Sequence, residues 1–216
     1  MSHYFINDDN LKNEEKVIHS EIQGINLSFL SNSGVFSKDK IDYGTKLLLN
    51  SIDIDDMKGD VLDLGCGIGV IGITIKSKNN LVLVDMVDVN ERAINLSKYN
   101  MVLNRVDTHI FISDIYSNVN KKYDYIITNP PIRAGKKVVF GMILGSYDYL
   151  NDNGILYFVM RKDHGVKTVI KKMEGMFKID VINRDKGFYI VKCVKMKKVK
   201  KVCKINWLIV KYLLVL

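Results

Sequence analysis

The chain is poor in the residues that form covalent and metal crosslinks. Its three cysteines, Cys66, Cys193 and Cys203, are odd in number and lie far apart. Such a set predicts neither a disulfide framework nor a zinc knuckle. The four histidines, at positions 3, 19, 109 and 164, lack the spacing of metal ligands. We therefore expect no metal site, and we interpret Cys66 as a small filler rather than a nucleophile.

Long apolar segments are also absent. No stretch near the N-terminus has the apolar centre of a signal peptide. The apolar end of the chain, residues 205–216, has 12 residues. A helix needs about 20 residues to cross a bilayer, so this segment is too short. We expect a cytoplasmic protein, and a membrane partner is not expected.

The last 21 residues, 196–216, differ from the rest of the chain. They hold six lysines and no acidic residue, and so carry six of the eight net positive charges. Three roles are open for them: a basic and apolar surface anchor, an additional packed element, or an extension beyond the domain end. We favour the extension. Residues 1–195 are only mildly basic, so net charge alone does not indicate a nucleic-acid partner.

Proline is rare as well, and the only two prolines are adjacent, at Pro130 and Pro131. They follow Asn129 and an apolar run, and they predict the end of a buried strand and a rigid turn. In open α/β sheets, ligands bind at the carboxyl ends of the strands. The Asn129 amide oxygen and the Pro130 carbonyl would offer two acceptors there. This pair suits a planar amino group with two N–H donors.

Glycine, in contrast, is concentrated in the segment Asp63–Gly72, between an apolar strand and an apolar helix. Glycine allows a tight turn that a ligand can approach, and a helix start offers free N–H groups. The spacing is not that of the dinucleotide fingerprint, because Val70 occupies the place of its third glycine. Asp63 is expected either to hold an ammonium group or to organise the loop.

Acidic residues follow the next two predicted strands. Asp88 lies 21 residues after Gly67, about the distance at which a ribose-binding carboxylate is found in α/β nucleoside sites. Asp85 competes for this role, but we favour Asp88 because it lies at the strand end. Asp114, after the third strand, suits the exocyclic amine of an adenine. These residues complete a series of polar side chains at four successive strand ends.

Strands and helices alternate through the middle of the chain. Five strands separated by helices are predicted, at 60–65, 81–87, 108–113, 123–129 and 154–160. This order favours right-handed βαβ units and a mostly parallel sheet. Two further strands, at 176–183 and 187–195, are expected to form a hairpin.

Two elements are expected before this core. Residues 15–32 alternate like a hairpin that turns at Gln23 and Gly24, and a helix is predicted at 40–51. The sequence is thus divided into an N-terminal hairpin and helix packed on the core (1–52), the core itself (53–195) and the tail (196–216).

As a set, these motifs resemble those of class I S-adenosylmethionine-dependent methyltransferases of the amino-group type. The similarity is closer to the small methyltransferase domain of the small-subunit ribosomal RNA guanine-N2 methyltransferases, over about residues 1–195. It also rests on four segments, His3–Phe5, Ser33–Ser37, Asp42–Thr45 and Asn129–Lys136. One position departs from the pattern. Ile132 stands where many of these enzymes have a Phe or Tyr that stacks on the target base.

The resemblance implies a Rossmann-like α/β fold with a mostly parallel seven-stranded sheet, helices on both faces and an N-terminal β-hairpin. It implies the cofactor S-adenosyl-L-methionine, with the binding residues Asp63, Gly65, Cys66, Gly67, Asp88, Val89, Asp114 and Asn129. Asn129 and Pro130 are expected to be catalytic. The expected substrate-binding residues are Pro131, Ile132, Arg133, Lys136 and Phe36. For Phe36, a place in the core is an equal alternative.

The expected methyl acceptor is guanine N2 of 16S ribosomal RNA, and the expected partner is this RNA or the small ribosomal subunit. Arg133, Lys136 and Lys137 flank the proline turn and would contact phosphates, or else form a solvated loop. Two other functions stay open. One is the same chemistry on an adenine, a protein glutamine or a small molecule, and the other is a non-catalytic RNA-binding module. Both a monomer and a homodimer are compatible with the sequence.

Overall fold

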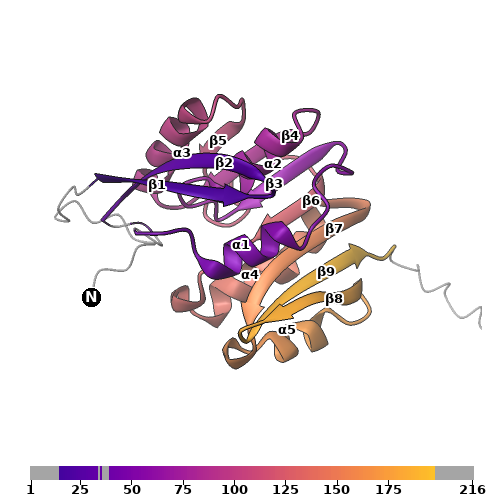
Figure 1. The fold of residues 1–216 in the computed structure, drawn as a ribbon. Coiled ribbons are helices and arrows are strands. Elements are labelled where there is room, and N and C mark those ends of the chain that lie inside the picture. The colour runs from indigo at the N-terminus through magenta and orange to yellow at the C-terminus, as the bar shows by residue number, and fades with distance from the viewer. Residues whose placement is uncertain (1–14, 34, 36–38, 198–216) are drawn as a thin grey trace, which may run out of the picture.

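The computed structural model describes residues 15–33, 35 and 39–197 (Figure 1). The predicted alternation of strands and helices is present. In chain order the elements are β1 (Glu15–Ile22), β2 (Ile25–Asn32), α1 (Tyr43–Asn50), β3 (Asp60–Leu64), α2 (Val70–Lys78), β4 (Leu83–Asp88), α3 (Glu91–Leu103), β5 (His109–Ile112), β6 (Tyr123–Thr128), η1 (Ile132–Ala134), α4 (Lys136–Tyr149), β7 (Leu150–Arg161), η2 (Lys162–His164), α5 (Val166–Met173), β8 (Phe177–Asp185) and β9 (Phe188–Lys195).

The main sheet has seven strands in the order β5-β4-β3-β6-β7-β9-β8. The first five strands in this order pair in parallel, and β9 pairs antiparallel with both β7 and β8. The order reverses direction at β3, so β3 and β6 are neighbours although β4 and β5 lie between them in sequence. Ligands bind at such a switch point in α/β sheets. The predicted fold class is confirmed.

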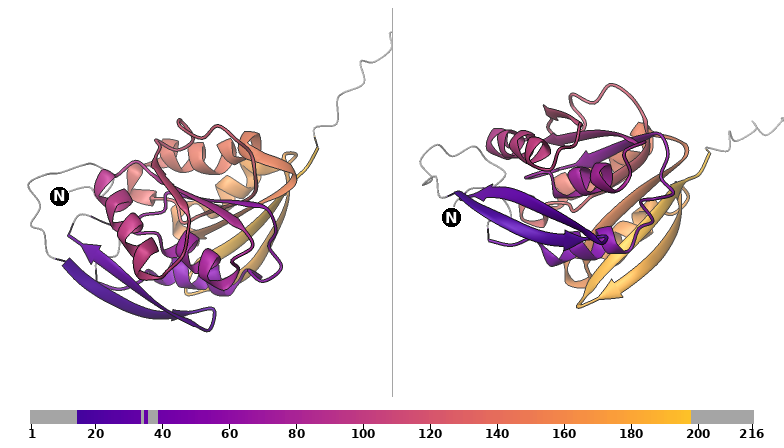
Figure 2. Two further views of the ribbon diagram at one scale, coloured as in Figure 1. Left: turned by 90° about the horizontal axis from the view of Figure 1, so that it is seen from above. Right: turned by 45° about the horizontal axis from the view of Figure 1, so that its top comes forward.

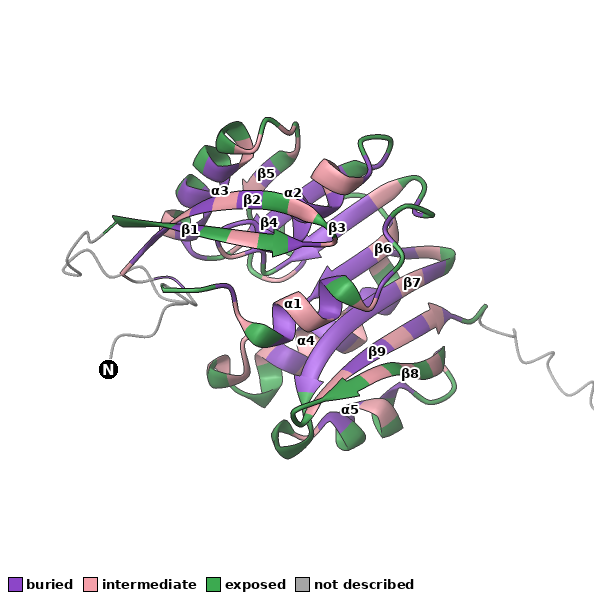
Figure 3. Cartoon of the chain, viewed as in Figure 1, coloured by how far each residue is buried: buried purple, intermediate pink, exposed green. Residues whose placement is uncertain are grey.

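Two apolar cores lie on the two faces of this sheet. Alternate residues of β7 show the division, since Tyr157 and Val159 face one core and Leu156 and Phe158 face the other. Helices α1, α2 and α3 and the hairpin contribute to the first core, and α4 and α5 contribute to the second. Strands β3, β6 and β7 are therefore mostly buried (Figure 3).

The N-terminal hairpin pairs β1 with β2 and lies outside the main sheet (Figure 2). Asn100 of α3 and Asn104, the residue that caps the end of α3, join it to the core. The Asn100 amide donates to the carbonyl of Leu30 at 3.0 Å and accepts from its N–H at 2.7 Å, and Asn104 makes the same pair of bonds with Ser28. The backbone N–H and C=O groups on the outer edge of β2 thus gain hydrogen-bond partners that an isolated hairpin would not have.

Several predicted boundaries were wrong by a few residues. The helix expected at 40–51 begins at Tyr43, because the Asp42 side chain accepts the N–H of Thr45 and caps the helix. Strand β4 begins at Leu83 rather than residue 81, and Leu81 is 85% exposed. Strand β7 begins at Leu150 rather than residue 154, since Leu150 already pairs with Tyr123 before a register shift. Among the described residues, no helix is long and apolar enough to cross a membrane.

Candidate functional site

A cavity of about 400 Å³ opens at the carboxyl ends of β3, β4, β5 and β6. It has the size of sites that bind small molecules and cofactors. The lining includes eleven residues predicted for the site, namely Gly65, Cys66, Gly67, Asp88, Val89, Asp114, Asn129, Pro130, Pro131, Ile132 and Arg133. The structure therefore brings together, in one cavity, residues that lie up to 68 positions apart in the sequence.

The glycine-rich loop forms part of the cavity wall. The N–H groups of Gly65 and Cys66 both donate to the Val87 carbonyl at 2.9 Å, which fixes the loop against β4. Gly67 has a φ of +56°, and a Cβ added there would have no atom within 4 Å. The backbone at Gly67 is thus open to a ligand that approaches closely.

Asp63 lies within β3 and is fully buried, and it is not among the cavity-lining residues. Its Oδ2 accepts the N–H of Gly72 in α2 at 2.8 Å, and its Oδ1 has no hydrogen-bond partner. Burial raises the pKa of Asp63 to about 7, against the opposing effect of the Gly72 bond. Of the two predicted roles, the bond to Gly72 fits an organising role at the start of α2. A contact with the cofactor stays a prediction.

Asp88, the last residue of β4, is half-buried and lines the cavity. Its Oδ2 accepts the Gly67 N–H and its Oδ1 accepts the Asn90 N–H, both at 2.9 Å. These bonds orient the carboxylate, and burial raises its pKa despite them. An oriented carboxylate beside an open glycine fits the hydroxyl groups of a ribose. The next residue, Val89, is 43% exposed and lines the same cavity.

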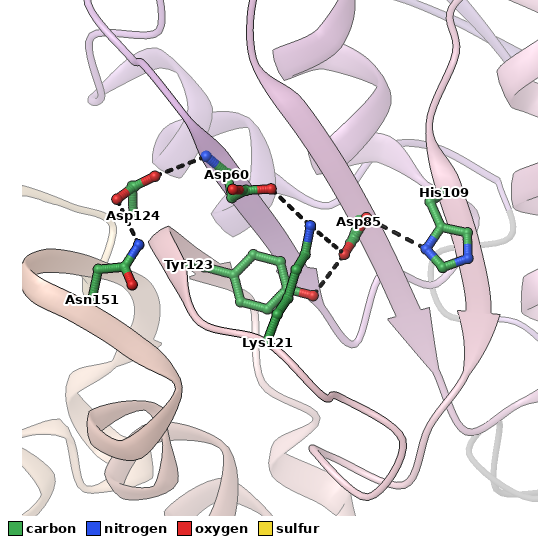
Figure 4. A network of polar contacts seen from close by, with 7 residues as sticks. All are labelled: Asp60, Asp85, His109, Lys121, Tyr123, Asp124 and Asn151. Atoms are coloured by element: carbon green, nitrogen blue, oxygen red, sulfur yellow. Dashed lines mark hydrogen bonds and ion pairs between the residues drawn. The ribbon is translucent and has the colours of Figure 1, made fainter.

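Asp85, the alternative to Asp88, belongs to a separate polar network (Figure 4). It accepts the Tyr123 hydroxyl at 2.7 Å and pairs with the Lys121 ammonium at 3.1 Å and with His109 at 3.5 Å. Lys121 also bonds to Asp60 at 2.7 Å. Asp60 and His109 are the first residues of β3 and β5, so this network lies at the amino ends of the parallel strands, away from the cavity at their carboxyl ends. Asp85 is not among the residues that line the cavity.

Asp114 is exposed and lines the cavity just after β5. Its backbone N–H donates to the Ser117 hydroxyl at 3.0 Å, which shapes a turn at this strand end. The following residue, Ile115, also lines the cavity and has a φ of +53°. A β-branched residue in the left-handed region is strained, and such strain is concentrated at functional sites.

The Asn129 side chain follows β6 and is held by α1. Its Nδ2 donates to Asp42 Oδ2 at 3.0 Å and to Thr45 Oγ1 at 2.9 Å. Because both N–H groups are used, the amide has one orientation and its Oδ1 is the acceptor that remains. Upstream, the Thr128 hydroxyl donates to the Leu64 carbonyl at 2.7 Å and fixes the end of β6 against β3.

The remaining predicted substrate residues have different positions. Pro131 and Ile132 are half-buried at the start of η1, and Arg133 is exposed at the cavity. Lys136 is exposed at the start of α4 and does not line the cavity, so its contact with a substrate stays a prediction. Phe36 lies outside the described residues, as do His3–Phe5 and most of the tail.

Sequence reasoning missed several residues of the site. Asp42 and Thr45 were noticed only as part of a resembling segment, yet they hold Asn129 and line the cavity. The capping pattern of Asp42 and Thr45 predicts a helix start but not the partner 87 residues away. Arg161 and Phe188 also line the cavity, and they come from β7 and β9. No group of three or more metal-ligating side chains occurs in the described parts of the chain.

The family model of the methyltransferase small domain matches residues 26–192. The chain belongs to this family. This membership confirms the predicted class, that of methyltransferases that use S-adenosyl-L-methionine as cofactor. The residues present fit such a cofactor, because the cavity offers an open glycine backbone, an oriented carboxylate and a second acid at successive strand ends.

Curated relatives differ in how much of their length the chain covers. The chain is 38% identical over 197 residues to the uncharacterized protein YbxB of Bacillus subtilis, and this match covers 89% of the chain and 98% of the relative. It is 37% identical over 145 residues to the ribosomal RNA small subunit methyltransferase C of Haemophilus influenzae. That match covers 65% of the chain and only 43% of the relative. The chain thus spans less than half of this longer enzyme.

Solved structures share the fold. The 16S rRNA N2 G1207 methyltransferase (RsmC) of T. thermophilus, in complex with AdoMet and guanosine, has a TM-score of 0.75 at 20% identity. The match covers 84% of this chain and 50% of that one. A ribosomal protein L11 methylase from Lactobacillus delbrueckii has a TM-score of 0.63, also at 20% identity, with 76% and 88% covered. These similarities support the Rossmann-like methyltransferase architecture.

Proposed function

We propose that this methyltransferase acts on an exocyclic amino group, and that the acceptor is guanine N2 of 16S ribosomal RNA in the small ribosomal subunit. One observation carries the proposal: the Asn129 amide is locked with its oxygen as acceptor, in the same cavity as the glycine loop and Asp88. Such a cavity holds an amine donor and a nucleoside cofactor next to each other.

The cofactor end of the cavity consists of the glycine loop and the acids at the strand ends. Asp88 would bind the ribose hydroxyls, since its carboxylate is fixed by the N–H groups of Gly67 and Asn90. Asp114 would accept the adenine amine, and Val89 would contact the flat face of the base. Asp63 supports this end through Gly72 rather than from within the cavity lining.

The acceptor end contains Asn129 and Pro130. An aromatic amine is a poor nucleophile, because its lone pair is delocalised into the ring. Asn129 Oδ1 and the Pro130 carbonyl would accept its two N–H groups, favour a tetrahedral nitrogen and stabilise the positive charge that develops there. When bound, S-adenosyl-L-methionine supplies a methyl group on a sulfonium, and its C–S bond breaks as the C–N bond forms. The extra N–H proton then leaves to solvent.

A base in a folded RNA must leave its stack to enter such a cavity. Arg133 at the cavity, and the exposed Lys136 and Lys137 next to it, would contact the phosphates beside that base. The name of the Haemophilus influenzae relative supports ribosomal RNA as the substrate. An enzyme with this substrate would act in the cytoplasm, as a monomer or as a homodimer.

Transfer of tritium from labelled cofactor to small ribosomal subunits tests this proposal. The subunits should come from cells that lack the corresponding methylation, and free RNA and protein fractions serve as comparison. We expect label in 16S RNA, recovered as N2-methylguanosine after nuclease digestion. Label recovered in methyladenosine, in protein or in no fraction would overturn the proposed acceptor.

A further inference from the structure

The cavity has a single Phe, Tyr or Trp among its lining residues in the described part of the chain, and this is Phe188. It is the first residue of β9 and follows the turn that joins β8 to β9. Ile132, which directly follows the two prolines, supplies no ring. Among the described residues, Phe188 therefore offers a flat acceptor the one benzene-type ring of this cavity, and the only other ring in the lining is the imidazole of His164.

Phe188 lies at the acceptor end of the cavity. A Cβ added at Gly44 would be 2.9 Å from Asp42 Oδ2 and also 2.9 Å from Phe188 Cε1. The same Asp42 Oδ2 accepts the Asn129 amide at 3.0 Å. The ring, the aspartate and the asparagine thus lie side by side, on the side of the cavity where the amine would bind.

Neighbouring groups hold the ring in place. The Arg161 guanidinium lies 5.4 Å from the Phe188 ring centroid, and Arg161 is the register partner of Phe188 in the pairing of β7 with β9. The Tyr43 ring is tilted by 50° at a centroid distance of 5.8 Å, and its hydroxyl donates to Asp185. Phe188 is nevertheless only half-buried, and Arg161 lines the cavity with it.

We propose that Phe188, together with the Arg161 guanidinium, forms the wall on which the acceptor base stacks. This inference rests on the proposed function and assigns the surface that would bind the face of its base. Nucleobases stack on aromatic rings and on guanidinium planes, whereas a flexible glutamine amide gains little from such a wall. The hairpin of β8 and β9 thus supplies the flat surface that Ile132, after the two prolines, does not offer.

Three variants separate stacking from simple packing. Phe188→Leu keeps an apolar side chain against Gly44 but removes the ring, and Phe188→Tyr keeps the ring. Tyr189→Leu is the matched control, because Tyr189 is the next residue of β9, faces the other core and does not line the cavity. Its ring also lies under an arginine, with the Arg184 guanidinium at 4.9 Å.

Steady-state methylation of undermethylated small ribosomal subunits gives the first readout. We expect Phe188→Leu to raise KM for the subunits or lower kcat/KM by about 10-fold or more, as base–aromatic stacking implies. Phe188→Tyr should restore most of the loss, and Tyr189→Leu should stay within about twofold of the parent chain. Cofactor affinity by calorimetry should be equal in all four proteins. If Phe188→Leu and the parent chain had equal KM and kcat/KM, the stacking role of Phe188 would be wrong and the proposed function would be unaffected.

A second readout does not depend on the natural acceptor. The riboside of 2-aminopurine is fluorescent, carries an amine at the position of guanine N2, and is quenched when it stacks. In the presence of S-adenosylhomocysteine, we expect the parent chain and Phe188→Tyr to quench it and Phe188→Leu not to. If the parent chain methylates no ribosomal RNA, the proposed acceptor is wrong. The fluorescence titration then decides by itself whether a base stacks on Phe188. Absence of quenching by the parent chain, or quenching that survives in Phe188→Leu, would overturn it.

Discussion

The Asn129 Nδ2 atom lies 3.0 Å from Asp42 Oδ2, although 87 positions separate the two residues. Asp42 is also the cap of α1, so one carboxylate fixes both a helix start and the amide that we propose binds the amine. The start of α1 is thereby tied to the end of β6. Asp42 is a positioning residue in this account, since it acts through Asn129.

The first prediction concerns this anchor. Asp42→Ala removes one of the two acceptors that hold the Asn129 amide and leaves only Thr45 Oγ1. We expect turnover to fall by about 10-fold, because the amide is then less well preorganised. Loss of the helix cap should also cost about 1 kcal/mol of stability. Asp42→Asn keeps an acceptor oxygen and should recover most of the activity.

Steady-state methylation assays, which give kcat, and calorimetry, which gives the Kd of the cofactor, check this prediction on the same proteins. The control is Asp39→Ala, which removes only an exposed ion pair with Lys16. A drop in kcat without a change in cofactor Kd supports the positioning role. Full activity of Asp42→Ala would show that the Asp42 contact is not needed to position the amide.

The second prediction compares the two aspartates of β4. Asp88→Asn removes the charge that would bind a ribose, and we expect the Kd for S-adenosyl-L-methionine to rise by about 10-fold. Asp85→Ala leaves the buried Tyr123 hydroxyl without its partner and should lower the free energy of unfolding by about 1–3 kcal/mol. Cofactor affinity should be unchanged in Asp85→Ala.

Calorimetry and denaturant unfolding of both variants measure these effects. We expect Asp88→Asn to change the Kd for the cofactor, and Asp85→Ala to change the free energy of unfolding. Weaker cofactor binding in Asp85→Ala, with none in Asp88→Asn, would reverse the assignment.

The third prediction concerns pH. Burial raises the pKa of Asp63 to about 7 in the folded chain, whereas an unfolded aspartate has a pKa near 3.9. Between these values the folded state binds a proton that the unfolded state does not. Stability from this group is therefore fully present below about pH 4, is lost as pH rises to about 7, and changes no further above it.

Asp63→Asn removes this titration and keeps an acceptor for the Gly72 N–H. The stability of Asp63→Asn relative to the parent chain should increase between pH 4 and 7, by at most about 4 kcal/mol. Urea unfolding of both proteins at matched pH values measures the difference. A difference that is independent of pH would show that Asp63 has an ordinary pKa.

Much of this site follows from local sequence, and the rest depends on contacts between distant segments. The strand ends near Asp88, Asp114 and Asn129 were predictable, because apolar runs followed by polar or proline residues are local signals. The orientation of Asn129 was not, since it depends on Asp42 in another element. Phe188 was equally hidden, because only the antiparallel return of β9 beside β7 brings it to the cavity.

Asp63 shows a different limit. Its place two residues before Gly65 left two roles open, and its complete burial and its bond to Gly72 depend on how β3 packs against α2. Strand boundaries shifted for similar reasons. Leu150 joins β7 through a pairing with Tyr123 that no local pattern encodes.

The proposed function depends most on Asn129, which would bind the amine in the same cavity as the glycine loop. Asn129→Ala, assayed for both methyl transfer and cofactor binding, tests it most directly. We predict that turnover falls by about 10²-fold or more, while the Kd for S-adenosyl-L-methionine stays within about threefold. Near-normal turnover of Asn129→Ala would contradict it.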